Sequence, residues 1–189
     1  MARKNTRNTR GKIVSAAWKL FYEQGYEDTT IEEIIEESGT SKGSFYHYFE
    51  GKDALLGSLA YMMDEKYEEL EPTIAEDMDS FEALLYLSHE LLSMIEETIN
   101  MELLTRLYST QLTTRGERPL LDHGRTYYKL LRKIITKGQK KGELTKVWSV
   151  GEMVHYYAMC ERAFLYEWCL RKGEYSLLED ADKKIQMMI

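Results

Sequence analysis

The chain has 189 residues, enough for one all-helical domain or for a small head joined to a larger body. It contains two prolines and is rich in Glu, Lys, Leu, Met and Tyr, a composition that favours helices throughout. Its formal net charge of −7 weighs at first sight against a nucleic-acid partner. Because no apolar run approaches about 18 residues and no secretion signal is apparent, we expect a cytoplasmic protein that does not span a membrane.

Positive charge is concentrated at the N-terminal end. The first twenty residues contain no acid, and their basic side chains are Arg3, Lys4, Arg7, Arg10, Lys12 and Lys19. Residues 51–189 carry 24 acids against 18 bases, so the net acidity belongs largely to the rest of the chain. We therefore predict a basic arm, Arg3–Lys12, that neutralises phosphates or enters a minor groove. The alternative is a disordered tail that improves solubility.

Two helices are expected before residue 40. An apolar stripe at helical spacing predicts the first, from about Thr9 to Gln24, and consists of Ile13, Ala16, Ala17, Leu20 and Phe21. Thr30 and Glu33 form a T-x-x-E capping box that opens a second helix. Gly39 stops that helix after about two turns.

Further helices follow the glycine at position 39. Thr40 or Ser41 is expected to cap a helix from Lys42 to about Tyr48, and a long helix should follow from about Lys52 to Leu70. The remaining helices are predicted at about 80–97, 100–110, 120–141, 149–172 and 176–189. The acidic stretch around Pro72 is interpreted as a solvated helix end and loop rather than a metal site.

Two short helices joined by a tight glycine turn are typical of a helix-turn-helix. The first helix braces the second, whose N-terminal end can enter a major groove about 12 Å wide. Gly39 takes the turn because a positive φ is cheapest for glycine. We expect Ile34 and Phe45 to anchor the two helices to the first helix. Gly43 permits close approach to DNA, and the side chains expected to point outward are Ser41, Lys42, Ser44 and His47.

The segments KIVSAAWKLFYEQGYEDTT (Lys12–Thr30) and TTIEEIIEESGTSKGSFYHYFEGKDALL (Thr29–Leu56) resemble the DNA-binding head of the TetR (tetracycline repressor) family. The resemblance implies an all-α fold, with a helix-turn-helix domain at residues 1–50 and a helical ligand-binding and dimerisation domain at residues 51–189. It implies base reading by Lys42, Gly43 and Ser44. The other DNA-binding positions, mainly phosphate contacts, are Thr30, Thr40, Ser41, Tyr46, Tyr48 and Lys52, and His47 fits either purpose.

Two positions depart from the family pattern. The family usually has a small residue where Ile35 stands and an apolar residue where Thr40 stands. Both differences indicate a slightly altered crossing angle or repacking around Gly43. Several alternatives stay open as well: Lys42 could be an ordinary solvated lysine, and Tyr46 or Tyr48 could belong to the core.

The resemblance also implies a homodimer formed through the last two helices. Both carry apolar stripes that must be buried inside the subunit or against a twin. They consist of Val150, Met153, Val154, Tyr157, Ala158, Phe164, Leu165 and Trp168, and of Leu177, Leu178, Ala181, Ile185 and Met188. A two-fold dimer places two recognition helices one DNA turn, about 34–36 Å, apart and predicts a palindromic operator.

An effector cavity in the body is a further implication of the family. Tyr and Met side chains could line it with His or Arg as polar groups, or they could simply be core. The candidate lining residues are Tyr86, His89, Tyr108, Tyr127, His155, Tyr156 and Met159. The predicted function is a repressor, or less commonly an activator. An unknown small molecule that favours a displaced fourth helix would release it from its operator.

The sequence gives less support to two other function classes. Glu152 and His155 have the Glu-x-x-His spacing of di-iron bundles, but no second copy is present. Neither a nucleophile elbow nor a Gly-rich phosphate loop occurs, so we expect no enzyme, metal or cofactor. Cys160 and Cys169 are expected to be reduced thiols. The remaining alternative is a helical ligand-binding or protein-interaction module without DNA binding.

Overall fold

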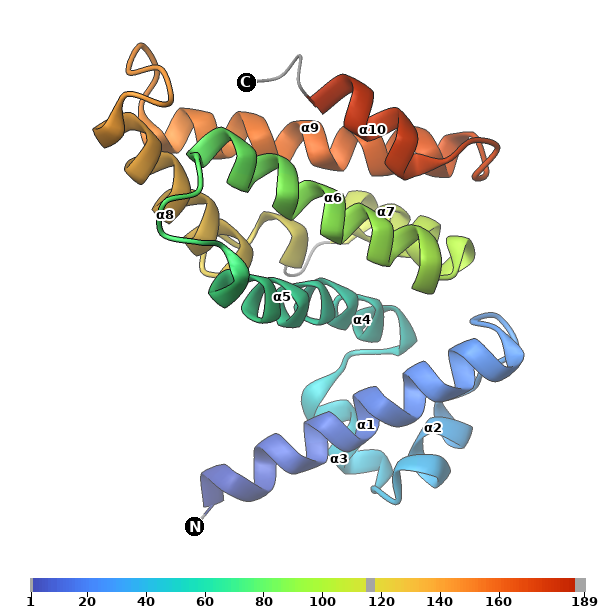
Figure 1. Ribbon diagram of the computed structural model, residues 1–189. Coiled ribbons are helices and arrows are strands. Elements are labelled where there is room, and N and C mark those ends of the chain that lie inside the picture. The colour runs from blue at the N-terminus through green and yellow to red at the C-terminus, as the bar shows by residue number, and fades with distance from the viewer. Residues whose placement is uncertain (1, 115–117, 186–189) are drawn as a thin grey trace. The chain divides into compact units, whose positions relative to one another are not determined.

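The computed structural model describes residues 2–114 and 118–185, with side chains from residue 9 onward. Throughout these residues the chain forms helices and connecting turns without a strand, so the expected all-α fold is confirmed (Figure 1). The chain divides into two compact units, residues 1–60 with 102–120 and residues 61–101 with 121–189. None of the described helices is both long and apolar enough to cross a bilayer.

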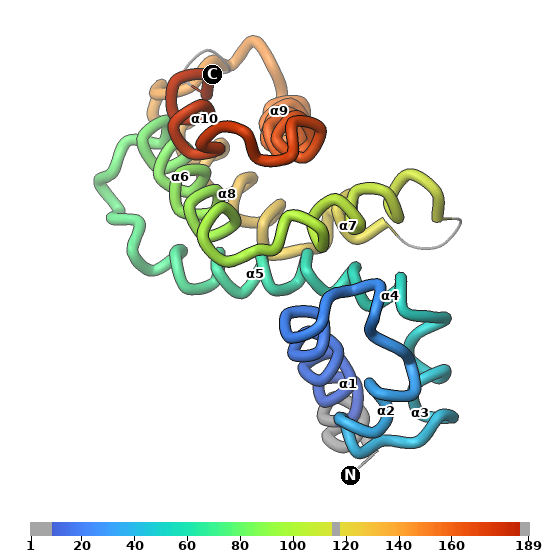
Figure 2. Tube along the Cα trace, turned by 90° about the vertical axis from the view of Figure 1, so that its right-hand side faces the viewer, coloured from blue at the N-terminus to red at the C-terminus, as the bar shows by residue number. Residues whose placement is uncertain are grey.

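The first unit is organised around α1, which packs against α2 and α3 (Figure 2). Ile34 and Phe45 are completely buried and hold the two short helices on α1, as expected. Trp18 adds a second anchor, because its Nε1 donates to Ser58 Oγ at 2.7 Å. The helices are α1 (Ala2–Gln24), α2 (Ile31–Ser38), α3 (Lys42–Tyr48), α4 (Lys52–Leu56), the start of α5 (Ser58–Leu70) and most of α7 (Met101–Thr113), with the 3-10 turn η2 (Pro119–Leu121).

Two expected boundaries in this unit were wrong. Helix α1 begins at Ala2 instead of near Thr9, so the basic segment predicted as an arm continues the helix. Arg and Lys are good helix formers and no proline interrupts the segment. The long helix predicted from Lys52 to Leu70 is interrupted at Gly57, where a Cβ atom would lie 3.1 Å from Pro119 Cγ.

The second unit contains η1 (Glu71–Thr73), α6 (Ser80–Thr98), α8 (Thr126–Lys141), α9 (Val150–Leu170) and α10 (Leu177–Ile185), together with the rest of α5. Helix α6 packs against α8 and α10, and α8 and α10 also pack against α9 (Figure 1). Gly138 allows a close approach in this bundle, because a Cβ there would lie 2.7 Å from both Ser80 Cβ and the Leu144 side chain.

Helix α8 begins at Thr126 and not at the predicted residue 120. Asp122 Oδ1 accepts a 2.8 Å hydrogen bond from Gly124 N in the preceding turn, and Arg125 is extended, so the helix cannot start earlier. At the other end of the chain, the Glu96 carboxylate on α6 accepts the N–H groups of Leu177 and Leu178 at 3.1 and 3.0 Å. This carboxylate fixes the start of α10. The predicted stripe residue Met188 lies outside the described residues.

Candidate functional site

Helix α2 and the turn after it are defined by their caps. Glu33 N donates to Thr30 Oγ1 at 3.2 Å and Thr30 N donates to Glu33 Oε2 at 2.8 Å, which confirms the capping box. Gly39 ends the helix with a φ of 60°, the left-handed conformation expected for it. These contacts set the direction in which the chain leaves α2 and enters α3.

Helix α3 presents a polar face to solvent. Ser41 caps it, since Ser41 Oγ accepts from Ser44 N at 3.1 Å. Phe45 turns the opposite face into the core. The exposed positions are Ser41, Lys42, Gly43, Tyr46 and His47, while Ser44 and Tyr48 are half-buried. A capped helix with a small-residue N-terminal end and one exposed cation is suited to a DNA groove.

Lys42 is paired across the turn with Glu32 of α2. Its Nζ lies 3.1 Å from Glu32 Oε1, and both side chains remain mostly exposed. The hydrogen bond and charge of Glu32 raise the pKa of Lys42, which keeps it a cation at neutral pH. The pair therefore holds a positive group at the start of α3, next to a carboxylate that DNA phosphates would repel.

Lys52 binds backbone rather than projecting into solvent. Its ammonium donates to the carbonyl oxygens of Tyr26, Glu27 and Thr29 at 2.5, 3.2 and 2.8 Å. An ammonium has three donors, so these bonds use all of them. Its Nζ also lies 4.3 Å from the centre of the Tyr26 ring. Lys52 thus fixes the loop between α1 and α2 from its position on α4.

The second unit contains a buried polar cluster formed by Tyr67 of α5, Ser88 of α6, Tyr127 of α8, and Tyr157 and Glu161 of α9. All five side chains are at most 7% exposed. Tyr127 Oη donates to Glu161 Oε2, and Tyr157 Oη donates to Leu84 O at 2.7 Å. In contrast, Glu161 Oε1, Tyr67 Oη and Ser88 Oγ form no hydrogen bond with any described residue.

Burial dominates the acid–base properties of this cluster. Desolvation raises the pKa of the Glu161 carboxyl, while the hydroxyls of Tyr127, Ser88 and Tyr157 and the charge of Arg162 oppose it. Desolvation is also the largest cause of the raised pKa of Tyr67, and the Glu161 carboxyl is the second largest. Such a cluster in the centre of a helical bundle is unusual, because buried polar atoms normally have partners.

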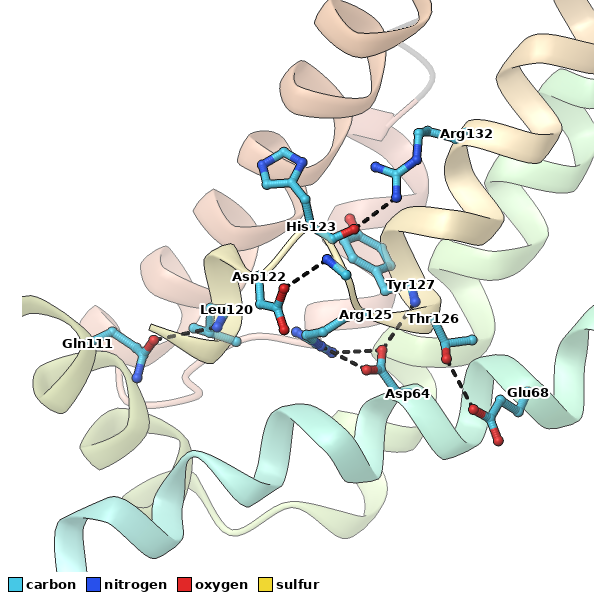
Figure 3. A network of polar contacts seen from close by, with 11 residues as sticks. Asp64, Glu68, Gln111, Leu120, Asp122, His123, Arg125, Thr126, Tyr127 and Arg132 are labelled. Carbon is cyan, nitrogen blue, oxygen red and sulfur yellow. Dashed lines mark hydrogen bonds and ion pairs between the residues drawn. The ribbon is translucent and has the colours of Figure 1, made fainter. Parts of the chain in front are cut away.

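A buried ion pair joins α5 to the start of α8 (Figure 3). Arg125 Nε and one terminal guanidinium nitrogen donate to the two oxygens of Asp64 at 2.9 and 3.0 Å, and Tyr127 N donates to Asp64 Oδ1 at 3.1 Å. Nearby, Thr126 Oγ1 donates to Glu68 Oε1 at 3.0 Å. The pair places the α5 carboxylate at the N-terminus of α8, where the helix dipole favours it.

Comparison with known proteins identifies the first unit. Residues 13–59 match the family described as bacterial regulatory proteins, tetR family. An uncharacterized HTH-type transcriptional regulator from Lactococcus lactis subsp. lactis is 48% identical over 48 residues, covering 25% of this chain and only 24% of that protein. The fatty acid metabolism regulator protein of Bacillus subtilis (strain 168) is 26% identical over 134 residues, 70% of this chain and 69% of the relative.

The likeness in fold extends over nearly the whole chain. FadR of Thermus thermophilus, a TetR-family transcriptional repressor solved in complex with lauroyl-CoA, has a TM-score of 0.75 at 22% identity. The match covers 95% of this chain and 92% of that one. Residues 13–59 therefore match the TetR family in sequence, and nearly the whole chain resembles TetR-family regulators in fold. The chain is thus a helix-turn-helix transcriptional regulator that binds DNA, as the sequence predicted.

Within this TetR-family head, the predicted DNA-binding residues lie together at α3 and its edges. Thr30 and Ser41 act as helix caps, and their exposed hydroxyls remain at the surface. Thr40 is half-buried and its hydroxyl lies 2.8 Å from that of Ser38, which satisfies the polar group at a position where the family usually has an apolar one. Lys52 differs from the rest, because its ammonium is bound to three carbonyls.

The predicted pocket residues of the body differ in burial and belong to both units. Tyr127 is at the buried centre, whereas Tyr86 is half-buried with its hydroxyl 3.1 Å from Thr73 Oγ1. The exposed positions are His89, which pairs with Asp182, and the α9 residues His155, Tyr156 and Met159. Tyr108 belongs to the first unit. In a single subunit, these exposed side chains do not line the interior of the bundle.

Glu161 is the residue that sequence reasoning missed. It occupies the buried face of α9, in the row formed by Val154, Ala158 and Leu165. An acid at helical spacing among apolar residues was the available signal. Glu152, by contrast, accepts from Ser149 N in a capping box at the start of α9. Among the described residues, no three His, Cys, Asp or Glu side chains gather as a metal site.

We predict that Lys52→Gln destabilises the head by about 1–3 kcal/mol, because three backbone carbonyls, two of them in part-buried hydrogen bonds, lose a charged donor. Hydrogen exchange of the amides of residues 25–30 should accelerate, and operator affinity should fall as the head loses order. Lys146→Gln, a change of the same type at an exposed position of the second unit, is the control. Unchanged exchange together with a smaller salt dependence of DNA binding would instead assign Lys52 to a phosphate.

The raised pKa of Glu161 predicts a pH-dependent stability. Between its ordinary value of 4.5 and the raised value, the folded protein keeps a proton that the unfolded chain releases. The free energy of unfolding therefore falls as pH rises through this window and levels off above it. Urea denaturation across this range should show wild type losing stability relative to Glu161→Gln. A difference between the two proteins that does not vary with pH would contradict the buried, protonated carboxyl.

Proposed function

We propose that this protein is a TetR-family repressor that binds a palindromic operator as a homodimer and is released by a small-molecule effector. The exposed face of α3 carries the proposal, since it offers Lys42, Gly43 and Ser44 to base edges while caps and Phe45 hold the helix. Phosphate contacts are assigned to residues around this face, such as Thr30, Tyr46 and Tyr48. We assign DNA binding to residues 1–50. The protein is proposed to act in the cytoplasm.

The exposed side of α9 supports the homodimer. A second apolar stripe runs along this helix, separate from the buried one, and consists of Tyr156, Met159, Ala163, Tyr166 and Leu170. Such a stripe is costly in water and fits a second copy of the same helix, because two-fold interfaces are self-complementary. We assign residues 51–189 to dimerisation through α9 and α10 and to effector binding.

The effector is proposed to act through α5. This helix begins in the first unit and continues in the second, where the Asp64–Arg125 pair ties it to α8. A ligand that binds better to a displaced α5 would favour dimers with altered head spacing, and these dimers would leave the operator. The B. subtilis relative is a fatty acid metabolism regulator and the Thermus structure contains lauroyl-CoA, so lauroyl-CoA is one ligand to test.

Selection of bound duplexes from a random pool tests the DNA-binding part of the proposal. We expect an inverted repeat whose half-sites are about one helical turn, 34–36 Å, apart. Adding the effector should then lower affinity for that duplex. Recovery of no enriched sequence at low salt would contradict the proposal and favour a helical ligand-binding or interaction module without DNA binding.

A further inference from the structure

We propose that the cluster of Tyr67, Ser88 and Glu161 recognises an effector whose buried end carries both a hydrogen-bond donor and an acceptor, with a neutral carboxamide as the best fit. The inference rests on the proposed function in one respect, namely that residues 51–189 bind an effector. It adds the chemical class of that effector and the residues that select it.

The hydrogen-bonding capacity of the cluster defines this class. Tyr67 and Ser88 each have a hydroxyl that can donate, and Glu161 Oε1 can accept, yet none of these atoms is bonded to a described residue. All three side chains are at least nine-tenths buried, so leaving them unsatisfied is costly. A carboxamide carbonyl can accept from the two hydroxyls while its N–H donates to Glu161.

The position of the cluster favours a single ligand that bonds to all three polar groups, rather than three unrelated buried groups without partners. Its members come from three helices, α5, α6 and α9. Besides the larger effect of burial, Glu161 raises the pKa of Tyr67, and the Ser88 hydroxyl lowers the pKa of Glu161. Tyr127 and Tyr67 place their rings 5.0 Å apart beside it, which supplies an apolar surface for the rest of a ligand.

The surrounding charges argue against a carboxylate. Asp64 is neutralised by Arg125, and the Arg162 guanidinium donates to Tyr128 Oη at 3.0 Å. The acceptor without a hydrogen bond in the cluster is Glu161 Oε1, and burying an ionised carboxylate beside the Glu161 carboxyl is costly. An ester or thioester carbonyl satisfies the two hydroxyls but has no donor for Glu161. The donor is therefore the group that decides specificity.

Three probes with the same alkyl chain test this: octanamide, methyl octanoate and octanoate. Binding is measured by calorimetry on the full chain without DNA. Octanamide should bind about tenfold or more tightly than methyl octanoate, which lacks the donor, and octanoate should bind most weakly. Glu161→Met should remove the preference for the amide, whereas Glu167→Met, on the same helix and only partly buried, should keep it.

Tyr67→Phe provides a second variant that leaves the shape of the cluster nearly unchanged. Because it removes a donor to the carbonyl, it should weaken the amide and the ester by a similar several-fold factor and keep the preference between them. Equal affinities of wild type for octanamide and methyl octanoate would overturn the proposal. Absence of binding by all three probes, with a water in contact with Glu161 Oε1 in a crystal of the protein, would overturn it too.

The same experiment separates this proposal from the proposed function. Calorimetry reports the site without reference to DNA, and operator release is measured afterwards. Amide binding that depends on Glu161 but leaves operator affinity unchanged would confirm the site and contradict effector-driven release. Release by a ligand whose binding ignores Glu161→Met would confirm regulation and contradict the site.

Discussion

Asp64→Ala should lower the free energy of unfolding by about 3–5 kcal/mol, because it leaves the buried Arg125 guanidinium without its carboxylate. Both side chains of the pair are less than a tenth exposed. The same change also removes the acceptor for Tyr127 N at the start of α8. Thermal and urea denaturation of the purified protein measure the loss directly.

Two variants show whether burial is the cause. Glu71→Ala breaks the ion pair between Glu71 and Lys133, which is of similar length but exposed, and should cost no more than about 1 kcal/mol. The double variant Asp64→Leu with Arg125→Met replaces both charges by apolar groups and should recover much of the lost stability. If Asp64→Ala costs no more than Glu71→Ala, the pair does not hold α5 to α8.

The local features of the head were predictable from sequence because they depend on neighbouring residues. The capping box of Thr30 and Glu33, the turn at Gly39 and the bounds of α3 follow from contacts within a few positions. The break at Gly57 was not predictable, since glycine is tolerated inside helices and the close approach of Pro119 is a tertiary effect.

The body was harder to predict at the level of the site. Aromatic and Met residues occur on every helix, and helical periodicity alone does not say which of two apolar stripes on α9 faces the core. Tyr156 and Met159, two of the candidate pocket residues, belong to the exposed stripe. Lys52 was assigned to a phosphate by resemblance, and only the fold shows its ammonium among the carbonyls of the α1–α2 loop.

Lys42→Ala should reduce discrimination between the operator and a scrambled duplex by about 1–3 kcal/mol per half-site, the value of one good base contact. The change leaves the caps and core of α3 intact, because Lys42 is exposed and its side chain forms an ion pair with Glu32. Fluorescence titrations of both duplexes at several salt concentrations give the discrimination and its salt dependence together.

Lys19→Ala is the matched control, since Lys19 forms an exposed pair of the same kind with Glu37 at 2.7 Å but lies on α1. It should leave discrimination unchanged. Glu32→Gln tests the other half of the pair: it removes a carboxylate beside the DNA-binding face and should strengthen binding to every duplex, most at low salt.

The salt dependence distinguishes the two possible roles of Lys42. A base contact adds affinity for one sequence, so its loss lowers operator binding more than binding to other duplexes. A phosphate contact adds affinity for all sequences, so its loss weakens both duplexes equally and reduces the salt slope by about one unit. Equal weakening of both duplexes by Lys42→Ala would move Lys42 to the phosphate backbone and leave Gly43 and Ser44 as the remaining candidates for base reading.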